Sequence, residues 1–392
     1  MAIAVWLFEA TCLGLLAIHL ASVATAIIRC RPRPYLVAPR AAAGVTLLRP
    51  VCGLDNFAEE TLRSSFDLDY PQYEIIFCAA HAHDAVVPLV RRLITAYPGV
   101  NARLLIGDER ISHNPKLNNM LKGWHAAAHE WIVIADSNVL MPRDYVQRLL
   151  AAWRADTGLI CSPPIGCMPS GFWAELECAF LNTYQARWQY FADSLGFGFS
   201  QGKTMLWRRE ELNAAGGLRA LATELAEDAA STKVVRQNGK RVRLVDAPFD
   251  QPLGCRTMAE VWRRQLRWAR LRRAAFPLCY LSEILTGGIV PILGSGALLA
   301  TAADIPLLAG VSAIAVLWYG AEAALAYAAR WHLSARDVSA WLAHDLLIPA
   351  LWIAGWLGNG IVWRGNQMDV ADTGALQASP AAVSAESGDS PF

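Results

Sequence analysis

Apolar residues gather into long uninterrupted runs near both ends of this 392-residue chain and into short runs in its middle. Residues 3–28 are almost continuously apolar, about the length that a helix needs to cross the hydrocarbon core of a bilayer. Three more segments of spanning length lie near 281–302, 305–328 and 338–362. The pattern predicts an N-terminal membrane anchor and a C-terminal group of membrane helices, about four spans in all.

From residue 45 to about 248 the pattern changes to short apolar runs that alternate with amphipathic stretches, as in a globular α/β domain. Strict alternation of strand and helix favours parallel βαβ units with right-handed crossovers. The last predicted helix is closed at its C-cap by Gly216 and Gly217. The predicted strands are 45–48, 73–79, 102–106, 131–135 and 202–207, and the predicted helices are 57–65, 86–97, 116–129 and 208–215.

Residues 258–273 predict a helix in which Trp and Leu are interspersed with arginine, a composition typical of a helix that lies in a membrane interface. His344 and Asp345 interrupt the last apolar segment, so part of that segment is expected to be interfacial or re-entrant. The tail is rich in Ala, Ser and Pro and has little to bury. The predicted divisions are an anchor (1–29), an α/β domain (30–255), a basic interfacial helix (256–277), membrane helices (278–366) and a disordered tail (367–392).

Composition and charge agree with a membrane protein. The chain is 54% hydrophobic with a mean hydropathy of +0.27, and its net charge of +1 gives no general case for nucleic-acid binding. Its nine cysteines include no Cys-x-x-Cys pair, which favours a reducing compartment over a zinc site or a disulfide framework.

Arginines at 29, 31, 33 and 40 follow the first apolar run, and none precedes it. The positive-inside rule then predicts a multi-pass integral membrane protein whose α/β domain faces the cytoplasm, at the inner membrane in a bacterial cell. Simple alternation of four spans would leave Arg364 outside, a position that its charge disfavours.

Candidate catalytic side chains begin with two carboxylates placed after predicted strands. Asp136 follows strand 131–135 and Asp84 follows strand 73–79, and the carboxyl ends of parallel strands are where open α/β sheets bind ligands. Asp228 stands beside Glu227 in an otherwise plain segment. Taken singly, each aspartate is more often a cap or a solvated side chain.

In this order, Asp84, Asp136, Asp228 and the run Arg264-Gln-Leu-Arg267-Trp268 resemble the D, D, D, (Q/R)-x-x-R-W motif of membrane-bound inverting glycosyltransferases with a GT-A fold. The resemblance is closer still to the ceramide glucosyltransferase family, glycosyltransferase family 21, and covers about residues 47–365. One departure is Asp136-Ser-Asn138, with an amide where many glycosyltransferases have a second carboxylate. Further matching tracts are 48–55, 69–74, 102–107, 114–119, 215–218 and 363–365.

The resemblance implies a hexosyltransferase that transfers a hexose from a UDP-sugar to ceramide, and glucose is the expected hexose. Diacylglycerol or a hopanoid lipid stays open as the acceptor, because nothing in the sequence excludes them. A non-enzymatic membrane protein that binds nucleotides is the alternative of another class. A transporter is disfavoured because the sequence has no Gly-x-x-x-x-Gly-Lys-Ser/Thr loop.

Donor binding and catalysis are assigned to four places. The resemblance implies that Asp84 binds the uracil edge or the ribose. Lys116 and Asn118, at the start of a predicted helix, suit the diphosphate. Asp136 would hold Mg²⁺ or Mn²⁺, since such ions take one or two carboxylates plus phosphate oxygens, and Asp228 would be the general base.

The basic helix supplies the remaining predicted site residues. Arg264 and Arg267 lie one turn apart and can bind diphosphate oxygens. Trp268 is expected near the acceptor on the membrane side. His81 and His83, which stand close to Asp84 in the sequence, are expected to be loop residues rather than metal ligands.

Overall fold

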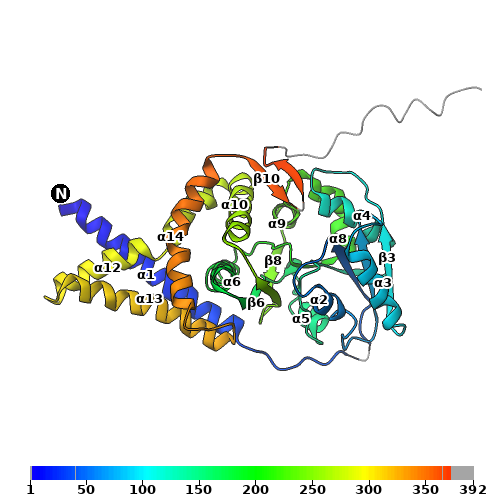
Figure 1. Cartoon of the computed structure of the whole chain (residues 1–392), viewed down its shortest axis with the longest axis horizontal. Coiled ribbons are helices and arrows are strands. Elements are labelled where there is room, and N and C mark those ends of the chain that lie inside the picture. Colours follow the sequence, from blue (N-terminus) through cyan, green and yellow to red (C-terminus); the bar gives the residue numbers. More distant parts are fainter. Residues whose placement is uncertain (1, 40, 364, 372–392) are drawn as a thin grey trace, which may run out of the picture.

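The computed structural model describes residues 2–39, 41–363 and 365–371, and its centre is a seven-stranded sheet in the order β3-β2-β1-β4-β7-β5-β8 (Figure 1). Strands β1 to β4 are parallel, β7 is antiparallel to both of its neighbours, and β8 is parallel to β5. The strands are β1 (Val45–Val51), β2 (Tyr73–Ala79), β3 (Asn101–Ile106), β4 (Trp131–Ala135), β5 (Thr157–Cys161), β7 (Thr204–Arg208) and β8 (Arg241–Leu244).

Helices cover both faces of this sheet, so its inner strands β1, β2, β4, β5 and β7 are buried along almost their whole length. Successive side chains of a strand point to opposite faces, and Leu47 accordingly packs with one layer while Leu48 packs with the other. The first layer contains α2 (Ala58–Arg63), α3 (Val86–Ala96) and α5 (Tyr145–Ala151); the second contains α4 (Pro115–Ala126), α8 (Arg209–Ala214) and α9 (Glu227–Gln237).

The predicted strands and helices all form, with ends shifted by a few residues, and Gly216 and Gly217 take positive φ after α8 as expected. Residues 139–201 and 238–255, to which the pattern assigned nothing, supply β5, β8 and a second sheet of two parallel strands. These two strands are β6 (Ile165–Ser170) and β9 (Asp250–Cys255).

A bent helical rod follows β6. It consists of α6 (Phe172–Ala179), a π-helical segment η1 (Phe180–Ala186) and α7 (Arg187–Ser194). A π-helical turn inserts an extra residue into the helix and is frequent at functional sites.

Apolar helices extend from the α/β domain (Figure 1). Within the described residues, three are long and apolar enough to cross a membrane, namely α1 (Ala2–Cys30), α13 (Leu307–Ala329) and α14 (Asp337–Trp356). A fourth candidate is a pair bent by 44°, formed by residues 277–286, which are α11 (Pro277–Ser282) and η3 (Glu283–Thr286), together with α12 (Ile289–Ala302). These elements confirm the predicted fold class, an α/β domain with an N-terminal apolar helix and further apolar helices after it.

Helix α14 is placed differently from α1, α12 and α13. It packs against α6 and against the basic helix α10 (Met258–Ala275), and in Figure 1 it stands between these helices and the others. Just before α14, Ser334 donates a hydrogen bond to Glu175 of α6. At its other end, Arg273 of α10 donates to the carbonyl of Trp356 over 3.3 Å. Both ends of α14 therefore contact the same part of the molecule.

After α14 the chain forms a hairpin of β10 (Gly360–Trp363) and β11 (Asn366–Asp369). The predicted disordered tail therefore cannot begin at residue 367, because β11 is paired through Asp369. Residues 372–392 and Arg364 lie outside the described part.

Buried polar contacts join α1 to the α/β domain. Arg187 of α7, 1% exposed, donates to Ser22 over 2.7 Å and contacts His19 Nδ1 at 3.0 Å. Arg29 forms an ion pair with Asp193 at 3.1 Å. An arginine of the predicted positive-inside cluster thus also fixes the anchor to the domain.

Candidate active site

Asp136 lies at the carboxyl end of β4 and is held between two lysines. Its Oδ1 is 2.7 Å from Lys116 Nζ, and its Oδ2 is 2.9 Å from Lys203 Nζ. Lys116 lies in the first turn of α4, whose N-cap Asn114 accepts hydrogen bonds from the first backbone amides of the helix. Lys203 immediately precedes β7, and because β7 runs antiparallel to β4, its start lies beside the end of β4.

Glu227 and Asp228, at the start of α9, complete this group. Glu227 Oε1 lies 2.6 Å from Lys116 Nζ, so that lysine bridges two carboxylates. Asp228 accepts hydrogen bonds from the backbone N–H groups of Gly202 at 3.1 Å and Ala229 at 2.8 Å. A Cβ on Gly202 would lie 2.9 Å from Glu227 Oε1, which explains a glycine at this close approach. We call these five residues the charged cluster: Lys116, Asp136, Lys203, Glu227 and Asp228.

The charges of the cluster shift the pKa values in opposite directions. Burial alone would raise the pKa of Asp136, but Lys116 and Lys203 lower it well below its usual range. Burial and the neighbouring Glu227 raise the pKa of Asp228 to about 6. Asp136 therefore stays ionised near neutral pH, whereas Asp228 has the proton affinity of a carboxylate suited to general-base catalysis.

Asp84 lies at the same edge of the sheet, separated from Asp136 by the intervening strand β1. Its carboxylate accepts hydrogen bonds from the backbone N–H groups of Gly53 at 2.8 Å and Val86 at 2.9 Å. Asp84 thus joins the loop after β1 to the start of α3, and Gly53 takes a φ of +65° in that loop.

The side chain of Asn118 makes hydrogen bonds with the backbone of the protein. Its Oδ1 accepts from the backbone N–H groups of Ile111 and Ser112, each at 3.0 Å, and its Nδ2 donates to the Ser112 carbonyl. Its side chain orders the loop that leads into α4, so any contribution to donor binding would come through that loop.

The residues of the basic helix have three different environments. Arg264 pairs with Glu177 of α6, which is 1% exposed and also accepts from Arg256 at 3.1 Å. Arg264 is also close enough to help lower the pKa of Lys203, after the larger effect of burial. Arg267 lies over the Trp363 ring, 5.9 Å from its centre, beside the β10–β11 hairpin.

Trp268 packs against Cys178 and Leu181 of the helical rod and Leu253 of β9. Its ring is partly buried in this small apolar cluster, between α10 and the helical rod of residues 172–194. Its role near the acceptor on the membrane side stays a prediction.

The charged cluster brings together Lys116, Asp136 and Asp228, as predicted, and adds Lys203 and the pairing role of Glu227. Sequence analysis missed Lys203 because its position at the start of a predicted strand gives no clue until that strand is known to be antiparallel. Glu177 was missed because no element was predicted around it.

Metal-binding groups are few in this region. Within residues 2–39, 41–363 and 365–371, no cluster of three or more His, Cys, Asp or Glu has an arrangement that could hold a metal ion. His81 and His83 stack on each other with ring centres 5.4 Å apart. Asp136 is the one predicted ligand, and Asn138 beside it accepts from Lys203 at 3.1 Å.

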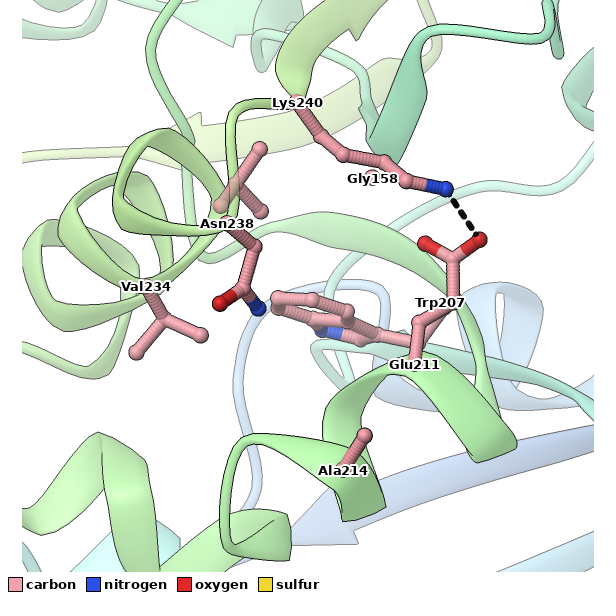
Figure 2. A pocket seen from close by; sticks show the side chains of 8 residues that line it. Gly158, Trp207, Glu211, Ala214, Val234, Asn238 and Lys240 are labelled. Atoms are coloured by element: carbon pink, nitrogen blue, oxygen red, sulfur yellow. Dashed lines mark hydrogen bonds and ion pairs between the residues drawn. The ribbon is translucent and has the colours of Figure 1, made fainter.

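A separate hollow lies between α8 and α9 and is lined by Trp207, Val234 and Asn238 (Figure 2). Lys240 and Glu211 form an ion pair of 2.7 Å at its side. Trp207 pairs in register with Ile132 near the start of β4, whereas Asp136 follows the end of that strand. The hollow therefore lies toward the other edge of the sheet and is not part of the charged cluster.

Comparisons with known proteins bear on this site. The sequence profile of Glycosyl transferase family 21 matches residues 10–376. Ceramide glucosyltransferase 3 of Caenorhabditis elegans is 26% identical, with 85% of this chain and 74% of that protein covered. Ceramide glucosyltransferase 1 of the same organism is 25% identical, covering 88% of this chain and 77% of that protein.

Among solved structures, a mannosyltransferase from Pyrobaculum calidifontis in complex with GDP-Man and Mn²⁺ is 18% identical, with a TM-score of 0.49. That similarity covers 89% of this chain and 98% of the mannosyltransferase. At this level, it says nothing of the ligands of this chain.

Proposed function

The chain belongs to glycosyl transferase family 21 and is a membrane-associated glycosyltransferase with a GT-A fold, and we propose that it transfers glucose from UDP-glucose to the hydroxyl of ceramide with inversion at the anomeric carbon. The observation that carries this proposal is the charged cluster: Asp228, a carboxylate with a raised pKa, stands beside Glu227, which pairs with Lys116, and Lys116 and Lys203 both pair with Asp136 at the carboxyl end of β4. The ceramide glucosyltransferases that the chain resembles support the choice of sugar and lipid.

Asp228 would act as the general base. It would take the proton from the acceptor hydroxyl as the hydroxyl oxygen attacks the anomeric carbon and the bond from that carbon to the UDP oxygen breaks. UDP leaves as an anion and needs no proton from a partner acid, so one carboxylate suffices. The raised pKa of Asp228 makes this carboxylate a stronger base than an ordinary aspartate.

The diphosphate would be bound at the two lysines. Lys116 lies in the first turn of α4, where the positive end of the helix dipole favours an anion. Lys203 and Arg264 would add positive charge from the other side, because Arg264 acts electrostatically on Lys203. Asp84, Asn118 and Arg267 remain in the proposal as donor-binding residues: Asp84 toward the base or ribose, Asn118 through its loop, and Arg267 from the basic helix.

The side chains at this site suit a divalent ion, since one carboxylate together with the phosphates of the sugar donor is a common Mg²⁺ ligand set. Asp136 would hold it, but both of its oxygens contact lysines, so at least one lysine must turn toward the phosphates when the ion binds. When bound, Mg²⁺ or Mn²⁺ would neutralise charge that develops on the leaving diphosphate.

The membrane orientation is also proposed. The α/β domain would face the cytoplasm, where UDP-sugars are made, and α10 would lie at the anionic inner leaflet. Helix α14 would lie along the interface instead of spanning, because both of its ends contact α6 or α10.

Orientation can be tested with a membrane-impermeant thiol reagent. The reporter is Glu210→Cys, whose side chain is 75% exposed, whereas Arg209 is partly buried and donates to the Ala127 carbonyl. The exposed native thiols Cys52, Cys255 and Cys279 are first changed to serine. Labelling is expected only after the membrane is opened; labelling of intact cells would contradict the orientation.

The function itself is tested by transfer of radiolabelled sugar. Membranes that contain the full chain are supplied with labelled UDP-glucose and with vesicles of ceramide, diacylglycerol or a hopanol. We expect label in ceramide above all. Label in diacylglycerol or the hopanoid would identify another acceptor, and binding of UDP-glucose without transfer would support the non-enzymatic alternative.

A further inference from the structure

An apolar groove lies between α6, α10 and α14. Its volume is about 260 Å³, and all of its lining residues are apolar except Gln265. Each helix contributes, for example Leu176 from α6, Val261 from α10 and Leu347 from α14. Met258 and Leu346, which also line the groove, are 55% and 59% exposed, so the groove opens to the surface.

Gln265 gives this groove one polar feature. The residue is 3% exposed, and its Oε1 accepts from Gln185 Nε2 over 3.1 Å. Among the described residues, Gln265 Nε2 and Gln185 Oε1 are both buried without a hydrogen-bond partner. If the oxygen and nitrogen atoms of both side-chain amides were exchanged, the pair would still have one N–H donor and one carbonyl acceptor without a partner. Buried polar groups are normally satisfied, so a free donor and a free acceptor on one bonded pair indicate a ligand that carries both.

The position of Gln265 connects the groove to the active site. Arg264, the preceding residue, is paired with Glu177 and acts on the charged cluster through Lys203. Gln185 comes from the π-helical segment η1, a departure from regular helix that is typical of functional sites. A lipid in the groove would therefore have its polar end near the basic residues that serve the donor.

We propose that this groove binds an acyl chain of the acceptor lipid, and that Gln185 and Gln265 recognise the amide that joins this chain to the rest of the lipid. The proposal rests on the proposed function and deepens it. Gln265 Nε2 would donate to the amide carbonyl, and Gln185 Oε1 would accept from the amide N–H. An ester has no N–H, so diacylglycerol in the groove would leave the Gln185 acceptor unsatisfied.

Selection by such a groove does not depend on hydrophobic driving force. Lipid chains in a bilayer are already in surroundings as apolar as leucine, so moving one into the groove removes little apolar surface from water. Shape and the amide pair must then distinguish one lipid from another. A site built to hydrogen-bond a polar group discriminates strongly against an analogue that lacks this group.

The first test measures acceptor preference in mixed vesicles that contain ceramide and diacylglycerol with matched chains. Gln265→Leu keeps a similar volume and removes the donor, so the kcat/KM for ceramide should fall about tenfold while the value for diacylglycerol changes less than about twofold. The KM for UDP-glucose serves as the control for folding and should not change. An unaltered preference for ceramide in Gln265→Leu would overturn the assignment of the amide pair.

A second variant tests the groove itself. Ala343→Leu adds side-chain volume inside the groove and should raise the KM for both lipids, whereas Ala350→Leu makes the same change at an exposed position of α14 that does not line the groove. Equal acceptor kinetics for the two variants would overturn the groove as a lipid site.

Binding is measured separately, with a ceramide that carries a photoactivatable group in its acyl chain. Crosslinks to α6, α10 and α14 that Ala343→Leu reduces and Ala350→Leu does not would support the groove; crosslinks elsewhere would overturn it. If the wild-type chain transfers no sugar to any lipid, the proposed function fails, and the crosslinks still decide whether the groove binds the acyl chain.

Discussion

The charged cluster and the apolar groove between α6, α10 and α14 are connected through two neighbouring residues, Arg264 and Gln265, but their side chains differ in kind. In the cluster, Lys116 is 2.7 Å from Asp136 and 2.6 Å from Glu227, and these close ionic contacts fix the three side chains. The groove is apolar apart from Gln265, whose buried amide pair with Gln185 has one free donor and one free acceptor. The contrast implies a division of labour, in which the cluster performs the chemistry and the groove selects the lipid.

The largest effect is expected from a change confined to the cluster. Asp228→Asn removes the base, because an amide cannot accept the proton of the acceptor hydroxyl, and kcat should fall about a hundredfold or more. The KM values for UDP-glucose and for ceramide should stay near those of the wild type. Near-normal turnover in this variant would remove Asp228 from the mechanism.

Chelation and Asp136→Ala address the metal and should have the next largest effect. Both should weaken the use of UDP-glucose by about tenfold or more, and Mg²⁺ or Mn²⁺ should restore only the chelated wild type. Rates are measured at a fixed ceramide content so that the groove is equally occupied. Full activity in EDTA would mean that Lys116, Lys203 and Arg264 neutralise the diphosphate without a metal.

Acid should inactivate the cluster but leave the groove intact. The pKa of Asp228 is raised to about 6, so its basic form is lost as pH falls through 6, and kcat should drop about tenfold between pH 7 and pH 5. Asp136, whose pKa is lowered, stays ionised over this range. Crosslinking of the photoactivatable ceramide should not change across the same range. A flat rate profile down to pH 5 would be inconsistent with Asp228 as the base.

Glu177 joins the two regions and offers a smaller, structural test. The residue is buried and pairs with Arg256 and Arg264, so Glu177→Gln should destabilise the fold by about 3 kcal/mol and reduce turnover several-fold. Glu59→Gln breaks an exposed pair with Arg92 and should cost less than about 1 kcal/mol. Thermal unfolding in detergent separates them; equal midpoints would show that the Glu177 pairs contribute no more than a surface pair.

Sequence patterns could predict the parallel half of the sheet, because β1, β2 and β4 are short apolar runs bounded by turns. They could also predict Asp136 and Asp228 through a motif that follows chain order. They could not predict Lys203, whose place beside Asp136 depends on the antiparallel direction of β7. Nor could they predict the groove, because α6 and η1 lie in a segment without clear periodicity and α14 has the composition of a spanning helix.

Lipid analysis of a host that lacks glycolipids, expressing either the wild-type chain or Asp228→Asn, tests the central claim most directly. We expect mass spectrometry to find a ceramide heavier by one hexose in cells with the wild-type chain and no such lipid in cells with the variant. A hexosylated diacylglycerol in place of the ceramide product, or the same product with both chains, would contradict the account.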